Sequence, residues 1–158
     1  MIRVLILAVG KLKEPAFSEA AKEYEKRLGP FCALNVTEIK PARLSEDPSP
    51  AEIEAALKSE AADILRRIPE NAAVYPLCVE GGRLSSEQFA GEINAKTCEG
   101  KTLCFIIGGS CGLHESVKSR GKPISFSDMT FPHRLFRVML LEQIYRAFTI
   151  IAGTKYHK

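Results

Sequence analysis

The glycine-rich segment at residues 108–112 (GGSCG) is the first place where this sequence can hold a ligand. It directly follows Lys101 to Ile107, an apolar run that predicts a strand buried on both faces of a parallel sheet. Glycines at a strand end let the backbone approach a ligand closely and expose N–H groups. Gly10 and the pair Gly81-Gly82 also follow predicted strands, and open parallel sheets bind ligands beyond such ends. A tight turn without a ligand explains so short a motif equally well.

A second candidate is the loop at residues 127–134 (SDMTFPHR). Pro132 restricts Phe131 to extended backbone, and extended backbone presents donors and acceptors that can bind the edge of an adenine. A flat apolar base can lie between this loop and side chains such as Leu77 and Phe131. The alternative is an ordinary helix entry with Thr130 as its cap.

Basic and aromatic residues gather at the end of the chain. They are Arg146, Lys155, Tyr156, His157 and Lys158. Cations meet phosphates and rings stack on unpaired bases, so this composition suits RNA. On charge alone, a solvated terminus is the simpler interpretation.

The composition describes an ordinary globular protein of 158 residues, with 46% hydrophobic and 26% charged residues, which argues against disorder. We therefore expect one domain over residues 1–158. The net charge of +3 is small, so an anionic partner would have to meet positive charge gathered locally or pooled between two subunits.

Other features bound the location and the cofactors. Five cysteines without a CxxC pair are typical of a reducing compartment. No signal peptide and no apolar stretch of roughly 20 residues is visible, so we expect a soluble cytoplasmic protein away from membranes. No metal is expected, because His114, His133 and His157 lack metal-ligand spacing.

Apolar runs alternate with amphipathic helices, which predicts an α/β fold with a mostly parallel sheet flanked by helices. The expected strands are residues 2–9, 32–39, 72–79, 101–107 and 123–126; the expected helices are 15–28, 50–67, about 86–97 and 133–152, with a short polar helix after residue 112. Residues 80–83 (EGGR) are expected to form a turn.

The last predicted helix has an apolar stripe that is wide for a monomer of this size, so part of it is expected at a subunit interface. The stripe comprises Phe136, Val138, Leu141, Ile144, Tyr145, Phe148 and Ile151. A Rossmann dinucleotide site fits poorly, since only GKLK follows the first strand, and a Walker phosphate loop is absent.

Five segments in order carry a family resemblance: LAVGKLKE, EYEKRLGPF, FIIGGSCGL, SFSDMTFPHRLFRVMLLEQIYRAF and the final YHK. Over essentially its whole length the chain resembles the bacterial 23S rRNA pseudouridine N3-methyltransferases, within the SPOUT methyltransferases. The resemblance implies a C-terminal trefoil knot, a rare exception to normal chain connections. It also implies a homodimer, S-adenosylmethionine bound in the knot, and RNA of the assembled ribosome bound across the subunit interface.

The resemblance assigns the methyl donor to a set of residues around the two loops described above. They are Leu77, Gly109, Ser127, Asp128, Met129, Thr130, Phe131 and Pro132, with Gly108 and Gly112 shaping the bend. Many relatives carry an acidic residue after the leucine of the third strand and a Gly-Lys pair in the following turn. Here Cys78 stands at the acidic position and Arg83 is displaced by one, so the expected contact at Leu77 is through its backbone.

Methyl transfer requires positioning, which can lower a barrier by roughly 7–11 kcal/mol, and removal of the N3 proton of pseudouridine. Candidates for assisting the proton are His133, Glu142, Tyr156 and His157, while Arg146 can hold a phosphate or stabilise charge on the base. A site that stabilises the deprotonated base needs no conventional base. Two other functions stay open: a non-catalytic ribosome-binding module of the same fold, and a nucleotide-dependent enzyme that binds NAD or ATP.

Overall fold

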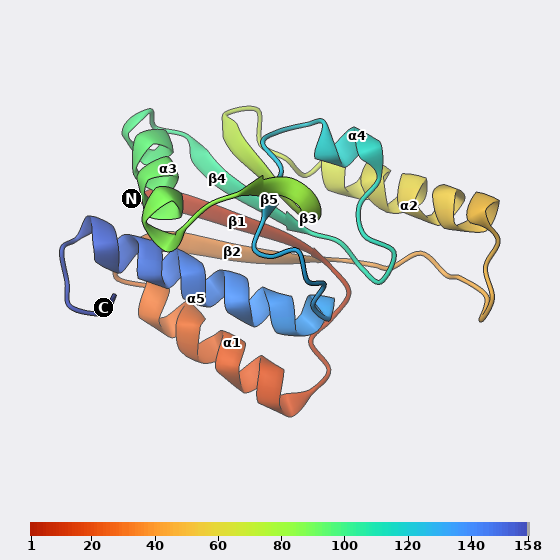
Figure 1. Cartoon of the computed structure of the whole chain (residues 1–158), viewed down its shortest axis with the longest axis horizontal. Coiled ribbons are helices and arrows are strands. Elements are labelled where there is room, and N and C mark those ends of the chain that lie inside the picture. The colour runs from red at the N-terminus through yellow and green to blue at the C-terminus, as the bar shows by residue number, and fades with distance from the viewer. Residues whose placement is uncertain (158) are drawn as a thin grey trace.

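The structure is a computed structural model that describes residues 1–157 and places an alternating series of strands and helices along the chain (Figure 1). The elements are β1 (Ile2–Val9), α1 (Pro15–Leu28), β2 (Cys32–Ile39), α2 (Pro50–Leu65), β3 (Ala72–Arg83), α3 (Ser86–Cys98), β4 (Thr102–Ile107), α4 (Glu115–Lys118), β5 (Ile124–Ser125) and α5 (His133–Ile151). The strands form one sheet in the order β2-β1-β4-β3-β5, and each pairing is parallel. The predicted α/β fold with a parallel sheet is confirmed. The elements β1, α1 and β2 have the expected bounds, and the ends of the others, except β3, lie within two residues of those expected.

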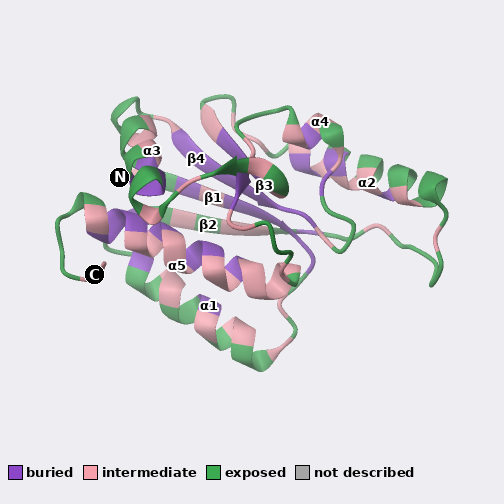
Figure 2. Ribbon diagram, viewed as in Figure 1, coloured by how far each residue is buried: buried purple, intermediate pink, exposed green. Residues whose placement is uncertain are grey.

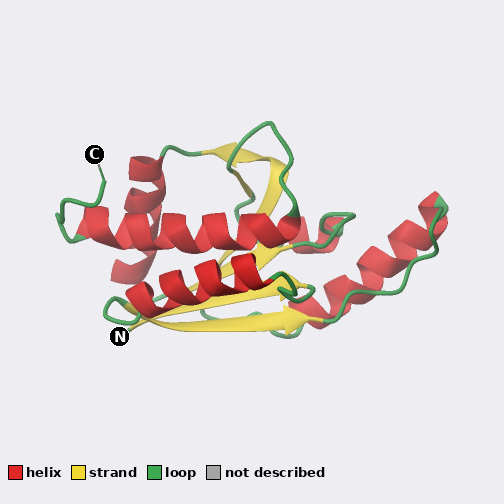
Figure 3. Ribbon diagram, turned by 90° about the horizontal axis from the view of Figure 1, so that it is seen from below, coloured by secondary structure: helices red, strands yellow, loops and turns green. Residues whose placement is uncertain are grey.

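The sheet is the middle layer of three, which explains why its strands are apolar on both faces. All six residues of the central strand β4 are buried (Figure 2). One face packs against α1, α3 and α5, through buried residues such as Ile6, Phe105 and Ile144. The other face packs against α2 and α4, through residues such as Ile106 and Ile64. Figure 3 shows α1 and α5 side by side over the first face, with α2 extending away from the body of the molecule.

The turn expected at residues 80–83 is wrong, because β3 continues through them to Arg83. A bulge between Leu77 and Gly82 bends the strand, and the Gly82 N–H donates to the Pro123 carbonyl at 3.0 Å. A Cβ on Gly81 would lie 2.6 Å from the Ile124 carbonyl carbon, so this position requires glycine for the close approach of β5. The two glycines serve strand pairing, although they resemble a turn signal in sequence.

The terminal helix α5 differs from its expected apolar stripe at two points. Leu141, Ile144 and Phe148 are buried as expected, whereas Ile151 is 40% exposed. A charged residue, Arg137, is buried on the same helix. The proposed cap Thr130 is wrong, because Pro132 occupies the N-cap position and makes no side-chain cap hydrogen bond.

No helix in residues 1–157 combines the length and apolar character that crossing a membrane requires. The same residues contain no cluster of three or more His, Cys, Asp or Glu side chains placed to hold a metal ion. The tail residue Lys158 lies outside the described residues.

Candidate active site

A cavity of about 320 Å³ lies at the carboxyl ends of β3 and β4, within the range of about 300–1,000 Å³ typical of small-molecule sites. Three stretches far apart in sequence form its walls: the bent end of β3, the glycine bend after β4, and the loop between β5 and α5. The lining residues are Leu77, Cys78, Val79, Glu80, Ile107, Gly108, Gly109, Ser110, Cys111, Gly112, Leu113, Lys118, Ile124, Ser125, Phe126, Ser127, Met129, Thr130, Phe131, His133 and Phe136.

The glycine bend forms one wall because its backbone folds tightly on itself. Gly112 adopts a φ of 79°, and its N–H donates to the Gly109 carbonyl at 3.1 Å. A Cβ on Gly108 would lie 2.4 Å from the Gly112 carbonyl oxygen, closer than real Cβ atoms approach. The bend therefore depends on glycine at 108 and 112, and it exposes backbone to the cavity.

The loop before α5 forms the opposite wall and is fixed by short-range contacts. The Ser125 hydroxyl donates to the Ser127 carbonyl at 2.9 Å, and the Met129 N–H donates to the Ser127 hydroxyl at 3.0 Å. Phe131 stacks on Phe136, with ring centroids 6.5 Å apart and planes 16° apart. The wall thus combines a held backbone with aromatic faces.

The structure brings together most of the residues assigned to the methyl donor. Six of them line the cavity: Leu77, Gly109, Ser127, Met129, Thr130 and Phe131. Asp128 and Pro132 belong to the same loop but are absent from the lining. The Asp128 carboxylate pairs with Arg83, and its side chain is 70% exposed.

Several lining residues were missed in the sequence, among them Val79, Ile107, Phe126 and Phe136. Val79 lies at the bulge of β3, and the other three lie close to an end of a strand or helix. Apolar side chains at such positions look like ordinary core residues in the sequence. Their only available signal was this position at a carboxyl strand end or beside the loop.

The charges around the cavity are arranged at its rim. Glu80 and Lys118 form an ion pair, and this contact lowers the pKa of Glu80, so its carboxylate stays ionised. Burial raises the pKa of the Cys78 thiol, which therefore stays neutral. At the position where many relatives are acidic, this chain presents an uncharged wall.

His133 is the predicted catalytic residue that lies at the cavity. It begins α5 and lines both this cavity and a neighbouring cleft. Burial, followed by the charges of Arg134 and Arg137, lowers the pKa of His133. Its imidazole is therefore neutral near pH 7 and can accept a proton.

The other predicted catalytic residues form a hydrogen-bonded network toward the far end of α5. Arg146 donates to Glu142 at 3.0 Å, and it contacts the His157 Nδ1 at 3.1 Å. The Tyr156 hydroxyl donates to Glu142 at 3.3 Å, and the Arg146 guanidinium lies 5.1 Å from the centre of the Tyr156 ring. His157 also contacts Glu87 of α3, at 2.7 Å. The four predicted residues are thus joined in one connected network.

Burial, a hydrogen bond with Tyr24 and the charge of Glu142 raise the pKa of Tyr156 to about 12. The pKa of Glu87 is lowered to about 2 by hydrogen bonds with its own backbone and with His157. Tyr156 is therefore a hydrogen-bond donor at neutral pH, and Glu87 is a carboxylate. Within this network the phenol is unsuited to removing a proton.

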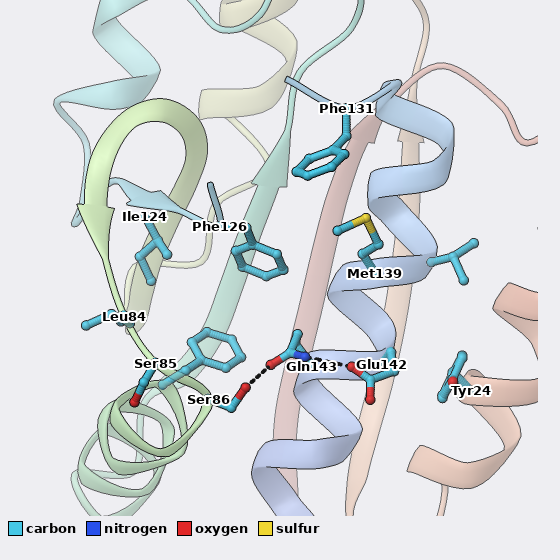
Figure 4. A pocket seen from close by; sticks show the side chains of 12 residues that line it. Tyr24, Leu84, Ser85, Ser86, Ile124, Phe126, Phe131, Met139, Glu142 and Gln143 are labelled. Atoms are coloured by element: carbon cyan, nitrogen blue, oxygen red, sulfur yellow. Dashed lines mark hydrogen bonds between the residues drawn. The ribbon is translucent and has the colours of Figure 1, made fainter. Parts of the chain in front are cut away.

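An open groove of about 440 Å³ connects the network with the cavity. Figure 4 shows side chains from α3, β5, α5 and α1 around it. Phe131, Phe126 and Ile124 line both the groove and the cavity, while Glu142 lines the groove only. Gln143 donates to Glu142 at 2.7 Å and accepts from Ser86 at 2.8 Å, which holds Glu142 in place.

A cavity at the strand ends of a parallel sheet, between a glycine bend and the loop before the last helix, is the geometry of this chain. The sequence model described as "Predicted SPOUT methyltransferase" matches residues 2–157. The chain belongs to the SPOUT methyltransferase family. SPOUT methyltransferases transfer a methyl group from S-adenosylmethionine, and the family generally acts on RNA.

Solved structures with low sequence identity share this SPOUT fold. A probable methylase family protein from Haemophilus influenzae Rd KW20 has a TM-score of 0.54 at 12% identity, over 99% of this chain and 70% of its own. A methylase family protein from Neisseria gonorrhoeae has a TM-score of 0.53 at 16% identity, over 91% and 82%. A structure concerned with 2-OH methylation of C/U34 on tRNA has a TM-score of 0.50 at 18% identity, over 96% and 98%.

Proposed function

We propose that this SPOUT methyltransferase methylates N3 of a pseudouridine in 23S rRNA, on the assembled ribosome in the cytoplasm. The observation that carries the proposal is the cavity in which the GGSCG bend and the SDMTFP loop face each other. These are two of the segments on which the resemblance to the pseudouridine N3-methyltransferases depends. The assignment of an RNA substrate rests in addition on the basic and aromatic tail, which ends in YHK.

The residues of the cavity fit S-adenosylmethionine. Residues 108–112 line one side of the space, and Ser127 with residues 129–131 lines the other. A side chain at Gly108 would collide with the Gly112 backbone and distort the first of these segments. Phe131 and Leu77 offer apolar surface to a base, while backbone groups of the loop can bind its polar edge. When bound, the donor supplies a methyl group already activated on a sulfonium.

His133 is the group best placed to take the N3 proton. It lines the cavity, and its lowered pKa keeps the imidazole unprotonated at neutral pH. Hydrogen bonding by neutral groups around the cavity would hold the deprotonated base until the methyl group is transferred.

The network of Glu142, Arg146, Tyr156 and His157 is proposed to hold RNA. Nine residues separate His133 from Glu142 on one helix, which corresponds to about 13 Å along its axis. A single chain therefore keeps the network apart from its own cavity. A homodimer formed over the apolar groove on α5 would let one copy present its network to the cavity of the other.

The proposal includes the C-terminal trefoil knot. It is supported by the strand order, in which β4 lies between β1 and β3 while β5 lies beyond β3. The chain then returns past the glycine bend to begin α5, since residues from both segments line one cavity.

Donor binding and ribosome methylation test the proposal separately. Calorimetry with S-adenosylmethionine should give saturable binding, and labelled donor should methylate ribosomes from cells that lack the gene. Mass spectrometry of digested rRNA should then find a methylpseudouridine restored by the enzyme. Donor binding without transfer would leave a ribosome-binding module, and NAD or ATP binding without donor binding would overturn the proposal.

A further inference from the structure

A second hollow, which we call the lysine cleft, adjoins the proposed donor cavity. Its volume is about 500 Å³. It lies beyond the carboxyl ends of β1 and β2, beside the middle of α2, which contributes Ala56, Leu57 and Glu60. Its lining residues are Val9, Gly10, Lys11, Lys13, Glu38, Ile39, Lys40, Pro41, Ala42, Leu44, Ala56, Leu57, Glu60, Gly109, Ser110, Cys111, His133 and Arg134.

Three lysines give the cleft its charge. Lys11 and Lys40 leave the ends of neighbouring strands, since the Gly10 N–H donates to the Ile39 carbonyl at 2.9 Å, and Lys13 follows shortly after. All three are exposed. In the part of the chain that the structure describes, none of them forms a salt bridge.

The carboxylates in the cleft do not cancel this charge. Glu38 accepts from Arg137 at 2.8 Å, and that guanidinium is buried. Glu60 accepts from the Ala42 N–H at 3.2 Å and is the other carboxylate of the lining, set against three lysines. Arg134, also in the lining, pairs with Glu14 outside it. The three lysines therefore remain as a local excess of positive charge in a protein whose net charge is only +3.

The cleft adjoins the donor cavity. Gly109, Ser110, Cys111 and His133 line both spaces. A polymer whose reacting base reached His133 would have its neighbouring units within reach of the cleft. The aliphatic side chains of Leu44 and Leu57 also line it and offer apolar surface to a sugar or base.

We propose that the lysine cleft binds the phosphate backbone of single-stranded RNA next to the methylated nucleotide. This inference rests on the proposed function, because it places the flanking nucleotides of that substrate. Lysines suit the role because they neutralise phosphates without needing a fixed geometry. Three cations without a salt bridge gather around one hollow that adjoins the proposed reactive site, and this combination of charge and place supports the proposal.

The test compares two triple variants that remove the same charge. Lys11→Gln, Lys13→Gln and Lys40→Gln empty the cleft of its lysines, while Lys22→Gln, Lys26→Gln and Lys58→Gln remove three exposed lysines of α1 and α2 outside it. Binding to ribosomes from cells that lack the gene is measured by sedimentation at several salt concentrations. Each lost phosphate contact reduces the salt slope by about 0.7, or affinity about fivefold at ~0.1 M salt.

The cleft variant should therefore bind ribosomes about 100-fold more weakly than the wild type at ~0.1 M salt, and the control should stay close to the wild type. Calorimetric affinity for S-adenosylmethionine should be unchanged in both, and Lys→Arg replacements in the cleft should restore ribosome binding. Circular dichroism and thermal melting check that the fold is retained.

Two results would overturn the inference. If the wild type binds ribosomes no more tightly than the cleft variant, the cleft holds no RNA. Equal losses in the cleft and control variants would show that only net charge matters. Failure of the proposed function has a different signature: no donor binding by the wild type, whatever the ribosome assay gives.

Discussion

The two ends of α5 carry side chains of similar type in opposite settings. At its start, His133 faces a cavity lined by the glycine bend and by many apolar side chains, and its imidazole is kept neutral. Toward its end, Arg146 is held among Glu142, Tyr156 and His157 in a network that pairs each charge with another. The start of the helix thus has a cavity with a neutral proton acceptor, and the far end has charged side chains held in place by one another.

Under the proposed function, one helix separates two tasks. A cavity for a positively charged donor would gain little from fixed cations at its walls, and here Lys118 is neutralised by Glu80 at the rim. A surface that must hold a polyanion requires ordered cations and rings instead. Because about 13 Å of helix lies between the two sites, changes at one end should leave the other intact.

The largest effect should come from distorting the glycine bend at Gly108. Gly108→Ala places a methyl group where the Gly112 carbonyl stands, so the bend must open. We expect loss of detectable S-adenosylmethionine binding and of methyl transfer, with unfolding easier by about 1–3 kcal/mol. Calorimetry and thermal melting measure the two effects.

Gly91→Ala is the matched control, because a Cβ there meets nothing within 4 Å and the residue lies inside α3. It should stabilise the protein by about 0.5–1 kcal/mol and spare donor binding. Normal donor affinity in Gly108→Ala would mean that the donor binds elsewhere.

The next largest effect should come from His133→Asn. Removing a general base lowers the rate by about 10²–10⁴-fold, while donor affinity changes little because the cavity keeps its shape. The sign of the pH dependence follows from the lowered pKa: the active form is the neutral imidazole. Wild-type activity should persist below the ordinary histidine pKa of about 6.5 and fall only at more acidic pH.

The pH profile of kcat separates a base from a structural residue. His133→Asn should lose the acidic limb of that profile, which a change in packing alone would leave in place. An acidic limb that survives in the variant would assign the proton transfer to another group.

A smaller effect should come from deleting residues 156–158, which removes Tyr156 and His157 from the network together with Lys158. Losing one stacked base contact costs about 1–3 kcal/mol, so methylation should fall by about 5- to 150-fold. S-adenosylmethionine binding should stay unchanged, since neither Tyr156 nor His157 lines the cavity.

Tyr156→Phe is the control for that deletion. It keeps the ring over Arg146 and loses only the hydroxyl, with its hydrogen bonds to Glu142 and Tyr24, so it should retain most of the activity. A deletion that abolishes donor binding would contradict the separation of the two ends of α5.

The sequence predicted the strands, most of the helices and the parallel sheet because buried strands read as continuous apolar runs, as in β1 and β4. It could not predict the extension of β3, since a pair of glycines gives the same signal for a turn and for close strand approach. It also missed the burial of Arg137, because the partners of that residue, Glu38 and the Gly10 carbonyl, come from distant parts of the chain.

The candidate site was predictable as a set of loops and less so as a set of side chains. Residues 127–132 are consecutive, and the family resemblance assigned them all to the donor. In the structure their neighbours decide which ones face the cavity: Phe131 packs on Phe136, whereas Asp128 turns to Arg83. The position of Arg83 depends on the bend of β3, which the sequence did not reveal.

The smallest effect should therefore come from Asp128→Asn. Its carboxylate and the Arg83 guanidinium are 70% and 65% exposed, and such surface pairs contribute about 0–1 kcal/mol. Donor affinity should change by less than about twofold, and stability by no more than that small amount. Phe131→Ala in the same loop should weaken donor binding much more, because its ring lines the cavity. A loss of donor affinity beyond about tenfold in Asp128→Asn, or about 1.4 kcal/mol, would show that Asp128 turns inward when the donor binds.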